Sequence, residues 1–267
     1  MDCKIIYRLL LLVIFFTSTQ THAIEFEGKF IQGHYIIGKT EPGKKIVIDK
    51  RKVQVSKDGY FAFGIEKDRK LDIVITENNK TTVKKIKKRK YNIQKIEGLP
   101  KKKVTPPEEF YARIKRENKL IGEAREIDSD LQFFKEEFII PVDDAIITGV
   151  YGSQRILNGI PKWPHYGLDF AQKKGTPIKA MNNGIVTLAE KDLFYTGATL
   201  IFDHGHGVST LYMHMDKIFV NVGDHVKKGD IVATIGTTGR STGPHLDIRL
   251  NWFGARLDPA TILNIQQ

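Results

Sequence analysis

Histidine and aspartate side chains recur in three short segments that alternate in the manner of β-strands. His165 and Asp169 stand in PHYGLDF, His214 in LYMHM, and His245 and Asp247 in GRSTGPHLDIRL. Successive side chains of a strand point to opposite faces, so each segment can turn polar groups one way and apolar groups the other. Buried polar groups need partners, and imidazole and carboxylate groups are ligands that suit zinc. The pattern predicts that three strand faces converge on one cation.

The same alternation predicts which neighbours of His214 are buried. It places Tyr212 and His214 together on the polar face of their strand. Leu211, Met213 and Met215 then occupy the opposite face and pack into the core.

Several other polar residues have simpler interpretations. His204 and His206 in DHGHG are expected in a hairpin turn and not at a metal. Arg155 in YGSQR could line a substrate groove or form a structural salt bridge. The basic run of residues 84–90 could bind an anionic polymer, but its interleaved apolar residues favour a charged strand face.

Five segments in the second half of the chain resemble the lysostaphin/LytM-type zinc metallopeptidases, the duplicated hybrid motif family. They occur in the order of that family and cover roughly residues 145–260. The resemblance implies a β-rich peptidase domain, an antiparallel sheet folded around a groove, that cuts peptidoglycan cross-bridges or stem peptides. The segments are VYGSQR, PHYGLDFAQKKGTPIKAMNNGIVTLAE, LIFDHGHGVSTLYMHM, VNVGDHVKKGDIVATIGTTGRSTGPHL and LDP.

The resemblance also implies roles for individual residues. The family pattern is H-x-x-x-D, a later histidine, and then H-x-H. By position, His165 and Asp169 match the first two zinc ligands. His214 and His245 match the catalytic histidines, of which one orients or deprotonates a water and the other stabilises the oxyanion. The chain departs from the pattern at the third ligand, where Asp247 replaces the second histidine of H-x-H.

Asp247 can be weighed as a ligand on physical grounds. A carboxylate oxygen lies two bonds from Cβ, as histidine Nδ1 does, and Zn–N and Zn–O bonds are similar at about 2.0–2.2 Å. Its cost is electrostatic, since two carboxylates leave the zinc site nearly neutral and acidify a water less. We expect Asp247 to be a ligand. The alternative is that it pairs with Arg249, two residues along the same face.

The elements that position these residues are mainly strands. Residues 24–98 alternate around turn signals at Pro42-Gly43 and Asp58-Gly59, which predicts a small all-β domain, a sandwich or barrel. Thr105, Pro106 and Glu108 have the pattern of a capping box, which predicts a linker helix. The region beyond is predicted to be an antiparallel β-sheet domain, barrel-like or a sandwich, with no long helix.

These patterns divide the chain into five parts. The predicted parts are a signal peptide at 1–23, a β-rich domain at 24–98, a linker at 99–141 with a helix at about 105–127, a peptidase-like domain at 142–260 and a tail at 261–267.

The N-terminus predicts export. Lys4 and Arg8 precede an apolar run that is too short to span a bilayer comfortably, and Ala23 ends a plausible cleavage site. The alternative is an uncleaved membrane anchor. Cys3, the only cysteine, would leave with the signal peptide, so neither disulfides nor a cysteine metal site are expected. The expected location is the periplasm or cell envelope.

The charge of the chain fits that location. Its 267 residues carry a formal net charge of +11, with a hydrophobic content of 41% that is ordinary for a globular protein. A basic protein is drawn to polyanions, and export argues against nucleic acid as the partner. The expected partners are peptidoglycan and, beyond it, an anionic envelope surface or other cell-wall enzymes.

The sequence therefore predicts an exported zinc endopeptidase that acts on peptidoglycan during wall remodelling. One alternative is a metal-free module of the same fold that regulates another cell-wall hydrolase. A second alternative is a biotinyl/lipoyl-like carrier, because VGDHVKKGDIVATIG resembles the hairpin of such carriers. The corresponding turns lack the Met-Lys-Met signature that a carrier needs, which argues against it.

Overall fold

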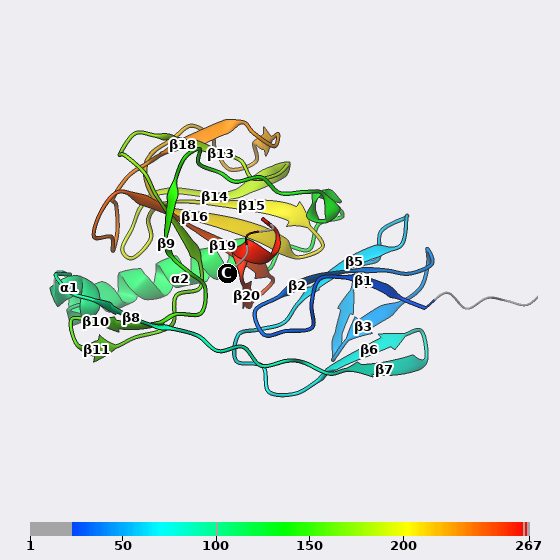
Figure 1. Ribbon diagram of the computed structural model, residues 1–267. Coiled ribbons are helices and arrows are strands. Elements are labelled where there is room, and N and C mark those ends of the chain that lie inside the picture. The colour runs from blue at the N-terminus through cyan, green and yellow to red at the C-terminus, as the bar shows by residue number, and fades with distance from the viewer. Residues whose placement is uncertain (1–22, 100, 264, 266–267) are drawn as a thin grey trace, which may run out of the picture.

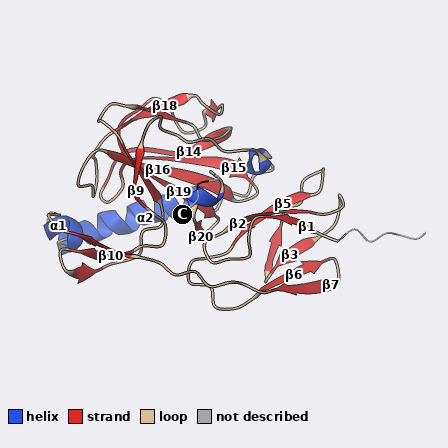
Figure 2. Ribbon diagram, in the orientation of Figure 1, coloured by secondary structure: helices blue, strands red, loops and turns tan. Residues whose placement is uncertain are grey.

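Strands make up most of the ordered structure, as the alternating patterns predict (Figure 2). The computed structural model describes residues 23–99, 101–263 and 265. The predicted signal peptide, apart from Ala23, lies outside the described residues. Among the helices that are described, none has the length and apolar character needed to cross a membrane.

The N-terminal region forms two small sheets that face each other across an apolar core. Eight short strands lie within residues 24–98, where the sequence predicts about six. The first sheet has the order β1 (Glu25–Glu27), β2 (Tyr35–Lys39), β5 (Tyr60–Gly64). The second has the order β4 (Arg51–Val53), β3 (Ile46–Ile48), β6 (Ile73–Glu77), β7 (Lys80–Lys84). The eighth strand, β8 (Ile93–Ile96), leaves this region and pairs in parallel with β10 (Gln154–Leu157), which also pairs with β11 (Ile160–Pro161).

The two N-terminal sheets share their core with the C-terminal region. Phe61 and Phe63 are fully buried in a cluster that also contains Leu250, Trp252 and Leu257. The approach is close at Gly64, where an added Cβ would lie 2.5 Å from the Leu257 side chain. The N-terminal region is therefore packed against the larger sheet and is not merely tethered to it (Figure 1).

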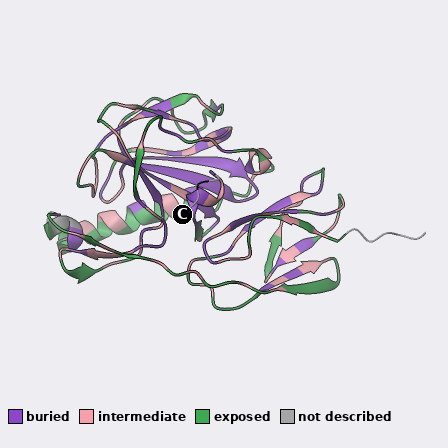
Figure 3. Ribbon diagram, in the orientation of Figure 1, coloured by how far each residue is buried: buried purple, intermediate pink, exposed green. Residues whose placement is uncertain are grey.

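A ten-stranded sheet forms the C-terminal region, and all its paired strands are antiparallel. Its main path runs β17-β14-β15-β16-β19-β12-β9, and β13, β18 and β20 pair off that path. The long central strands are buried along most of their length (Figure 3). The strands are β9 (Ile146–Gly149), β12 (Leu168–Ala171), β13 (Pro177–Lys179), β14 (Gly184–Leu193), β15 (Gly197–Gly205), β16 (Val208–Ile218), β17 (His225–Val226), β18 (Ile231–Ile235), β19 (His245–Trp252) and β20 (Ala255–Leu257).

The linker helix is shorter than the sequence predicts. It is α2 (Tyr111–Arg125), preceded by the single-turn α1 (Lys101–Val104) and the 3-10 turn η1 (Glu108–Phe110). Its N-cap is Phe110 without a side-chain cap, so the predicted capping box does not start the helix. The reason is Pro107, which is extended at φ −59° and ψ 154° and disfavours helical backbone at the residue before it. Two further 3-10 turns are η2 (Phe133–Lys135) and η3 (Pro259–Thr261).

The helix packs against the large sheet by one face. Ile121 and Ala124 pack against Leu188, Leu211 and Met213 of the large sheet. The helix thus covers part of the sheet face on which Asp247 and Arg249 lie, since these residues are the cross-strand partners of Met213 and Leu211 (Figure 1).

His204 is a buried structural residue at the end of β15 and not a turn residue, whereas His206 lies in the turn at φ +54°. Nδ1 of His204 lies 2.7 Å from the Asn183 carbonyl oxygen, and Nε2 of His204 lies 2.8 Å from Thr210 Oγ1. Burial lowers the pKa of His204 to about 4. The imidazole is therefore neutral at neutral pH, and its two hydrogen bonds satisfy both ring nitrogens.

We expect His204 to make the protein sensitive to mild acid. In the unfolded chain the imidazole binds a proton below its ordinary pKa of 6.5, whereas in the fold it stays neutral down to about pH 4. The free energy of unfolding should therefore fall by about 3 kcal/mol from this residue across that pH window. Urea denaturation of the wild type and of His204→Gln at pH 7 and pH 4 measures the difference. The exposed His225→Gln is the control, and an equal pH dependence in wild type and His204→Gln would contradict the assignment.

Candidate metal centre and cleft

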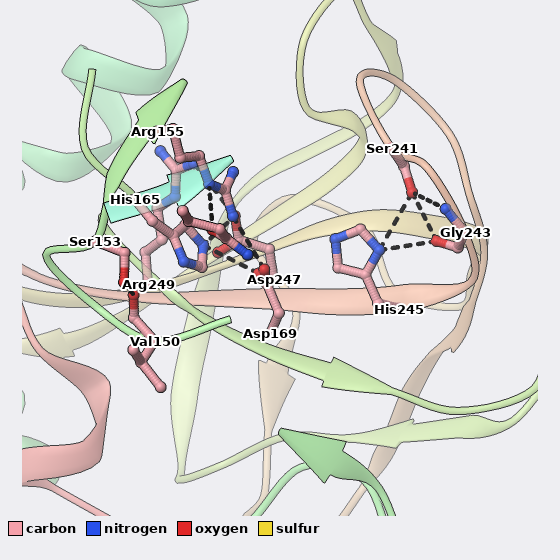
Figure 4. Close-up of polar contacts among 11 residues, drawn as sticks. Val150, Ser153, Arg155, His165, Asp169, Ser241, Gly243, His245, Asp247 and Arg249 are labelled. Carbon is pink, nitrogen blue, oxygen red and sulfur yellow. Dashed lines mark hydrogen bonds and ion pairs between the residues drawn. The ribbon is translucent and has the colours of Figure 1, made fainter. Parts of the chain in front are cut away.

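His165, Asp169 and Asp247 come together in one buried cluster (Figure 4). Asp169 on β12 and Asp247 on β19 are direct partners across the antiparallel pair. His165 Nε2 lies 3.0 Å from Asp169 Oδ1 and 3.3 Å from Asp247 Oδ2. One ligand atom of each residue lies within 4.8 Å of the others. The three positions that the sequence singles out as metal ligands are thus close enough to share one ion.

Two glycines make room for the carboxylates. A Cβ added at Gly149, the partner of Asp169 on β9, would lie 2.1 Å from Asp169 Oδ2. A Cβ added at Gly167 would lie 2.0 Å from Asp247 Oδ1. Real side chains cannot approach so closely, so both carboxylates pass over positions that only glycine can occupy.

Gly167→Ala is accordingly expected to disturb the candidate metal centre, and the added Cβ would also lie 2.7 Å from the Ile248 carbonyl oxygen of β19. The added methyl group must displace the Asp247 carboxylate, and we expect metal affinity to fall about 10- to 100-fold, as it does when groups that orient ligands are lost. Zinc affinity measured by competition with a chromogenic chelator tests this. Gly122→Ala is the matched control, because a Cβ there meets no atom within 4 Å. Unchanged zinc affinity in Gly167→Ala would contradict the steric argument.

The cluster carries a balanced set of charges even without a metal. Burial raises the pKa of Asp247, but Arg249 and His165 outweigh it and hold that pKa well below its usual range. Burial likewise raises the pKa of Asp169, and His165 reverses the effect. For His165 burial lowers the pKa, and the two carboxylates more than compensate and raise it. The metal-free cluster therefore favours a proton on the imidazole, which a bound cation would displace.

Two arginines contact the carboxylates. Arg155 Nη2 lies 3.0 Å from Asp169 Oδ2, and Arg249 Nη2 lies 3.3 Å from Asp247 Oδ2. Arg155 is in turn held by Gln94 of β8, whose Oε1 lies 3.3 Å from Arg155 Nε. The contact between Asp247 and Arg249 that the alternative interpretation predicts is thus present, and so is the approach of Asp247 to His165.

The chemistry of the donors fits a divalent metal. A histidine nitrogen and carboxylate oxygens are ligands of zinc and of similar ions. Asp169 Oδ1 and Asp247 Oδ1 are buried and have no hydrogen-bond partner among the described residues. Buried oxygens without a hydrogen-bond partner are costly, and a cation would satisfy them. Ligation by these three residues stays a prediction.

His214 and His245 lie beside each other next to the cluster, with ring centroids 4.8 Å apart. His214 Nδ1 lies 2.8 Å from the Thr238 carbonyl oxygen, and His245 Nδ1 lies 2.8 Å from the Gly243 carbonyl oxygen. A carbonyl only accepts, so Nδ1 of each ring donates and Nε2 keeps its lone pair. Figure 4 shows His245 with Nδ1 turned towards Gly243 and its other side towards the carboxylates. Burial, with the nearby His245, lowers the pKa of His214 to about 4.

A β-bulge brings His214 to this position, and it overturns the predicted facing of β16. Tyr212 pairs with Leu200 and Met215 pairs with Ala198, so Met213 and His214 together oppose one residue of β15. His214 has a left-handed backbone at φ +66°. As a result Tyr212 packs in the core with Met215, whereas Leu211 and Met213 lie on the opposite face beneath α2. The bulge re-aims one side chain, as bulges near functional sites do.

A cleft of about 800 Å³ opens over these residues. His165, His214 and Asp247 line it, and α2 forms part of its wall. Six cationic side chains line the cleft, but Asp247 is the one carboxylate among its described lining residues. The cations are Arg125, Arg155, Lys162, Arg240, Arg249 and Arg256.

Three of these arginines could not be identified as cleft residues from the sequence. Arg125, Arg240 and Arg256 come from α2, from the loop before β19 and from β20, and no motif connects them. The one hint in the sequence is Arg125, which ends a helix that packs by an apolar face. An arginine in that position does not by itself indicate a binding site. The sequence left two roles open for Arg155, lining a groove or forming a salt bridge. Arg155 lines the cleft and also pairs with Asp169.

Comparisons with known proteins agree with the geometry. Residues 163–259 match the model of peptidase family M23. A protein of Haemophilus influenzae named an uncharacterized metalloprotease is 38% identical over 99 residues, which are 37% of this chain and 21% of that protein. The peptidoglycan DD-endopeptidase ShyB of Vibrio cholerae is 43% identical over 83 residues, which are 31% of this chain and 19% of that protein. The chain thus spans about a fifth of the length of these relatives.

A solved structure extends the similarity beyond the matched segment. The crystal structure of a candidate M23 peptidase from Pseudomonas aeruginosa superposes with a TM-score of 0.68 at 26% identity. The match covers 88% of this chain and 95% of that one, so it includes the N-terminal sheets as well as the large sheet. The resemblance of the sequence is thus borne out for residues 163–259, which match peptidase family M23, and the fold of the chain is similar to that of a candidate M23 peptidase.

Proposed function

We propose that this protein is an exported, zinc-dependent endopeptidase that hydrolyses peptide bonds of peptidoglycan during remodelling of the cell wall. The observation that carries the proposal is the buried cluster of His165, Asp169 and Asp247 next to the His214–His245 pair. Three of these residues, His165, His214 and Asp247, line the cleft. A set of metal-ligating atoms, of which Asp169 Oδ1 and Asp247 Oδ1 lack a hydrogen bond among the described residues, is one component that metal-assisted hydrolysis requires, and a pair of oriented imidazoles is the other.

The substrate class is inferred from relatives. ShyB is named a peptidoglycan DD-endopeptidase, and a protein of Neisseria meningitidis that is 36% identical over 98 residues is named a DD-carboxypeptidase/endopeptidase. These names support a peptide of the cell wall as the substrate. The net charge of +11 supports attraction to an anionic wall or envelope surface.

His165, Asp169 and Asp247 would hold the zinc. When bound, the metal supplies Lewis-acid chemistry, lowering the pKa of a water and polarising the scissile carbonyl. The lone pair on Nε2 of one of His214 and His245 accepts a proton from the attacking water. The other ring, when it carries a proton on Nε2, donates a hydrogen bond to the oxyanion. The backbone carbonyls of Thr238 and Gly243 keep both rings in the required orientation.

The arginines adjust the charge of this unusual donor set. Two carboxylates and one imidazole would make the zinc site nearly neutral. Arg155 and Arg249 each contact a carboxylate, withdraw part of its negative charge and restore some positive field at the site. The substitution of aspartate for histidine at position 247 is in this way compatible with catalysis.

The proposed location is the periplasm or cell envelope. The support is the basic and apolar pattern of residues 1–23. Mass spectrometry of the full chain recovered from a fractionated bacterial host tests it. A mature N-terminus after Ala23 in the periplasmic fraction is expected, and a full-length protein held in the inner membrane would indicate the anchor instead.

Two measurements test the enzyme itself. Purified protein should contain about one zinc per chain, as a three-ligand catalytic site does, when assayed by plasma mass spectrometry. The same protein should release soluble muropeptides from isolated peptidoglycan, and a chelator should stop the release. A folded protein that binds no zinc at micromolar zinc concentrations would contradict the proposal.

The alternative is a metal-free member of the family that regulates another wall hydrolase. The ion pairs of Arg155 with Asp169 and of Arg249 with Asp247 favour it, because they satisfy part of each carboxylate without a metal. Absence of zinc together with stimulation of a second wall hydrolase in the same assay is the result that this alternative predicts.

A further inference from the structure

The polar face of β19 extends beyond the metal cluster into a strongly cationic part of the cleft. His245, Asp247, Arg249 and Asn251 follow one another at every second residue and share this face. Arg256 on β20 is the direct neighbour of Asn251. The row therefore begins at the catalytic histidines, passes the candidate metal ligands and ends among arginines.

Three arginines meet at that end. Arg125 enters from the last turn of α2, where its Nη2 donates to the carbonyl oxygens of Phe253 and Gly254. Arg256 lies over the ring of Tyr166, 4.6 Å from its centroid. Arg249 comes from β19 itself. Burial and the repulsion from Arg256 and Arg249 lower the pKa of Arg125 to about 10.

The charges of these arginines are incompletely neutralised by the protein. Among the described residues, Nε of Arg125 and Nε of Arg249 are buried without a hydrogen-bond partner. Asp247 is the carboxylate that lines the cleft, and it is shared with His165. Buried donors without partners are costly, so this arrangement is most stable when an anion from outside the protein occupies it.

We propose that Arg125, Arg249 and Arg256 form a subsite that binds a free carboxylate of the substrate peptide. The guanidinium group matches a carboxylate because it can donate two parallel hydrogen bonds. The inference rests on the proposed function, since it takes the ligand to be the peptide that is cleaved.

The spacing of β19 gives the position of that carboxylate. Arg249 lies two residues from Asp247 and Asn251 lies four residues from it, which is about 7–13 Å along the strand. A peptide advances at most about 3.3–3.6 Å per residue. The recognised carboxylate therefore lies about two to four residues from the scissile bond. A short stem peptide with a free acid group meets this condition, and an internal segment of a neutral chain does not.

A pair of peptides that differ in one group tests the subsite. The probes are acetylated tetra-alanine with a free C-terminal carboxylate and the same peptide with a C-terminal amide. Binding is measured by titration calorimetry on the zinc-supplemented full chain carrying His214→Ala, so that cleavage does not interfere. We expect the acid to bind about tenfold more tightly than the amide, as a charge-assisted contact predicts.

Arg256→Gln identifies the groups responsible. In that variant the preference for the acid should fall to within about threefold, because one guanidinium is lost. Arg256 is exposed, so its replacement should leave the fold intact. Arg116→Gln removes the same charge from an exposed position of α2 outside the cleft and should leave the preference unchanged.

Several results would overturn the proposal. Equal binding of acid and amide by the Arg256-containing protein is one. A preference that persists in Arg256→Gln would assign the carboxylate to the zinc, and a loss in Arg116→Gln would assign it to the overall charge. Inorganic phosphate that binds with the same dependence on Arg256, while the peptides bind equally, would make the cleft a phosphate site. Hydrolysis plays no part in this readout, so an inactive protein could show the preference and an active peptidase could lack it.

Discussion

His214→Ala is expected to lower kcat on isolated peptidoglycan about 10²–10⁴-fold, the usual contribution of a positioned acid or base. Zinc content should stay the same, because His214 is not one of the three clustered candidate ligands among the described residues. The imidazole is neutral at neutral pH, since its pKa lies at about 4. Its Nδ1–H donates to the Thr238 carbonyl, so the lone pair of Nε2 is available to a proton.

The measurement is muropeptide release under saturating substrate, with zinc quantified on the same samples. His225→Ala is the control, because His225 is an exposed residue of β17 and is not among the described residues that line the cleft. Activity of His214→Ala within about tenfold of the wild type would exclude this ring as the proton acceptor or oxyanion donor. A loss of zinc in parallel with activity would instead make His214 part of the metal site.

Asp247→Asn is expected to abolish hydrolysis by removing the metal. The amide has the shape of the carboxylate but no charge, and it leaves His165 and Arg249 without their shared anion. Zinc affinity should fall by more than about 100-fold, because even the loss of groups that merely orient ligands costs 10- to 100-fold.

Asp247→His separates the requirement for a ligand from the requirement for a charge. Nδ1 of the new histidine can reach the position of the carboxylate oxygen, so zinc binding should be retained. Zinc affinity of all three proteins, measured by chelator competition, makes the comparison. If Asp247→Asn bound zinc as tightly as the wild type, the carboxylate would be only the partner of Arg249.

The sequence predicts the positions of Asp169 and Asp247 well because the alternation holds on their strands, whereas His165 lies in the segment before β12. On β12 and β19 the alternation holds, so Leu168, Phe170, Leu246 and Ile248 are in the core. Asp169 and Asp247 then meet on the opposite face as direct cross-strand partners. Strict period-two alternation is what makes such residues predictable from their spacing.

The alternation fails at β16 because one residue is inserted there. The extra residue at Met213 and His214 exchanges the faces of Leu211 and Tyr212 relative to the prediction. A bulge without glycine leaves no mark in the sequence pattern. His214, the candidate catalytic histidine, is therefore the residue whose orientation could not be inferred from the spacing of its neighbours.

The cationic cleft could not be predicted for a different reason. Its arginines come from segments up to 131 residues apart, from Arg125 to Arg256, and they meet only because α2 packs across the sheet. The start of that helix also depended on Pro107, whose effect on the preceding residue outweighs the capping pattern. Long-range packing therefore decides the cleft, whereas a local effect of proline decides where the helix starts.

The way the N-terminal sheets close over Leu250, Trp252 and Leu257 limits how this protein can be shortened. Trimming the chain to the segment that matches family M23 would expose those side chains to solvent. They include Leu257, which is fully buried in the intact fold. Bare apolar surface of that kind promotes self-association. Any shortened form of this protein should therefore carry both regions, or replace these residues with polar ones before the large sheet is used alone.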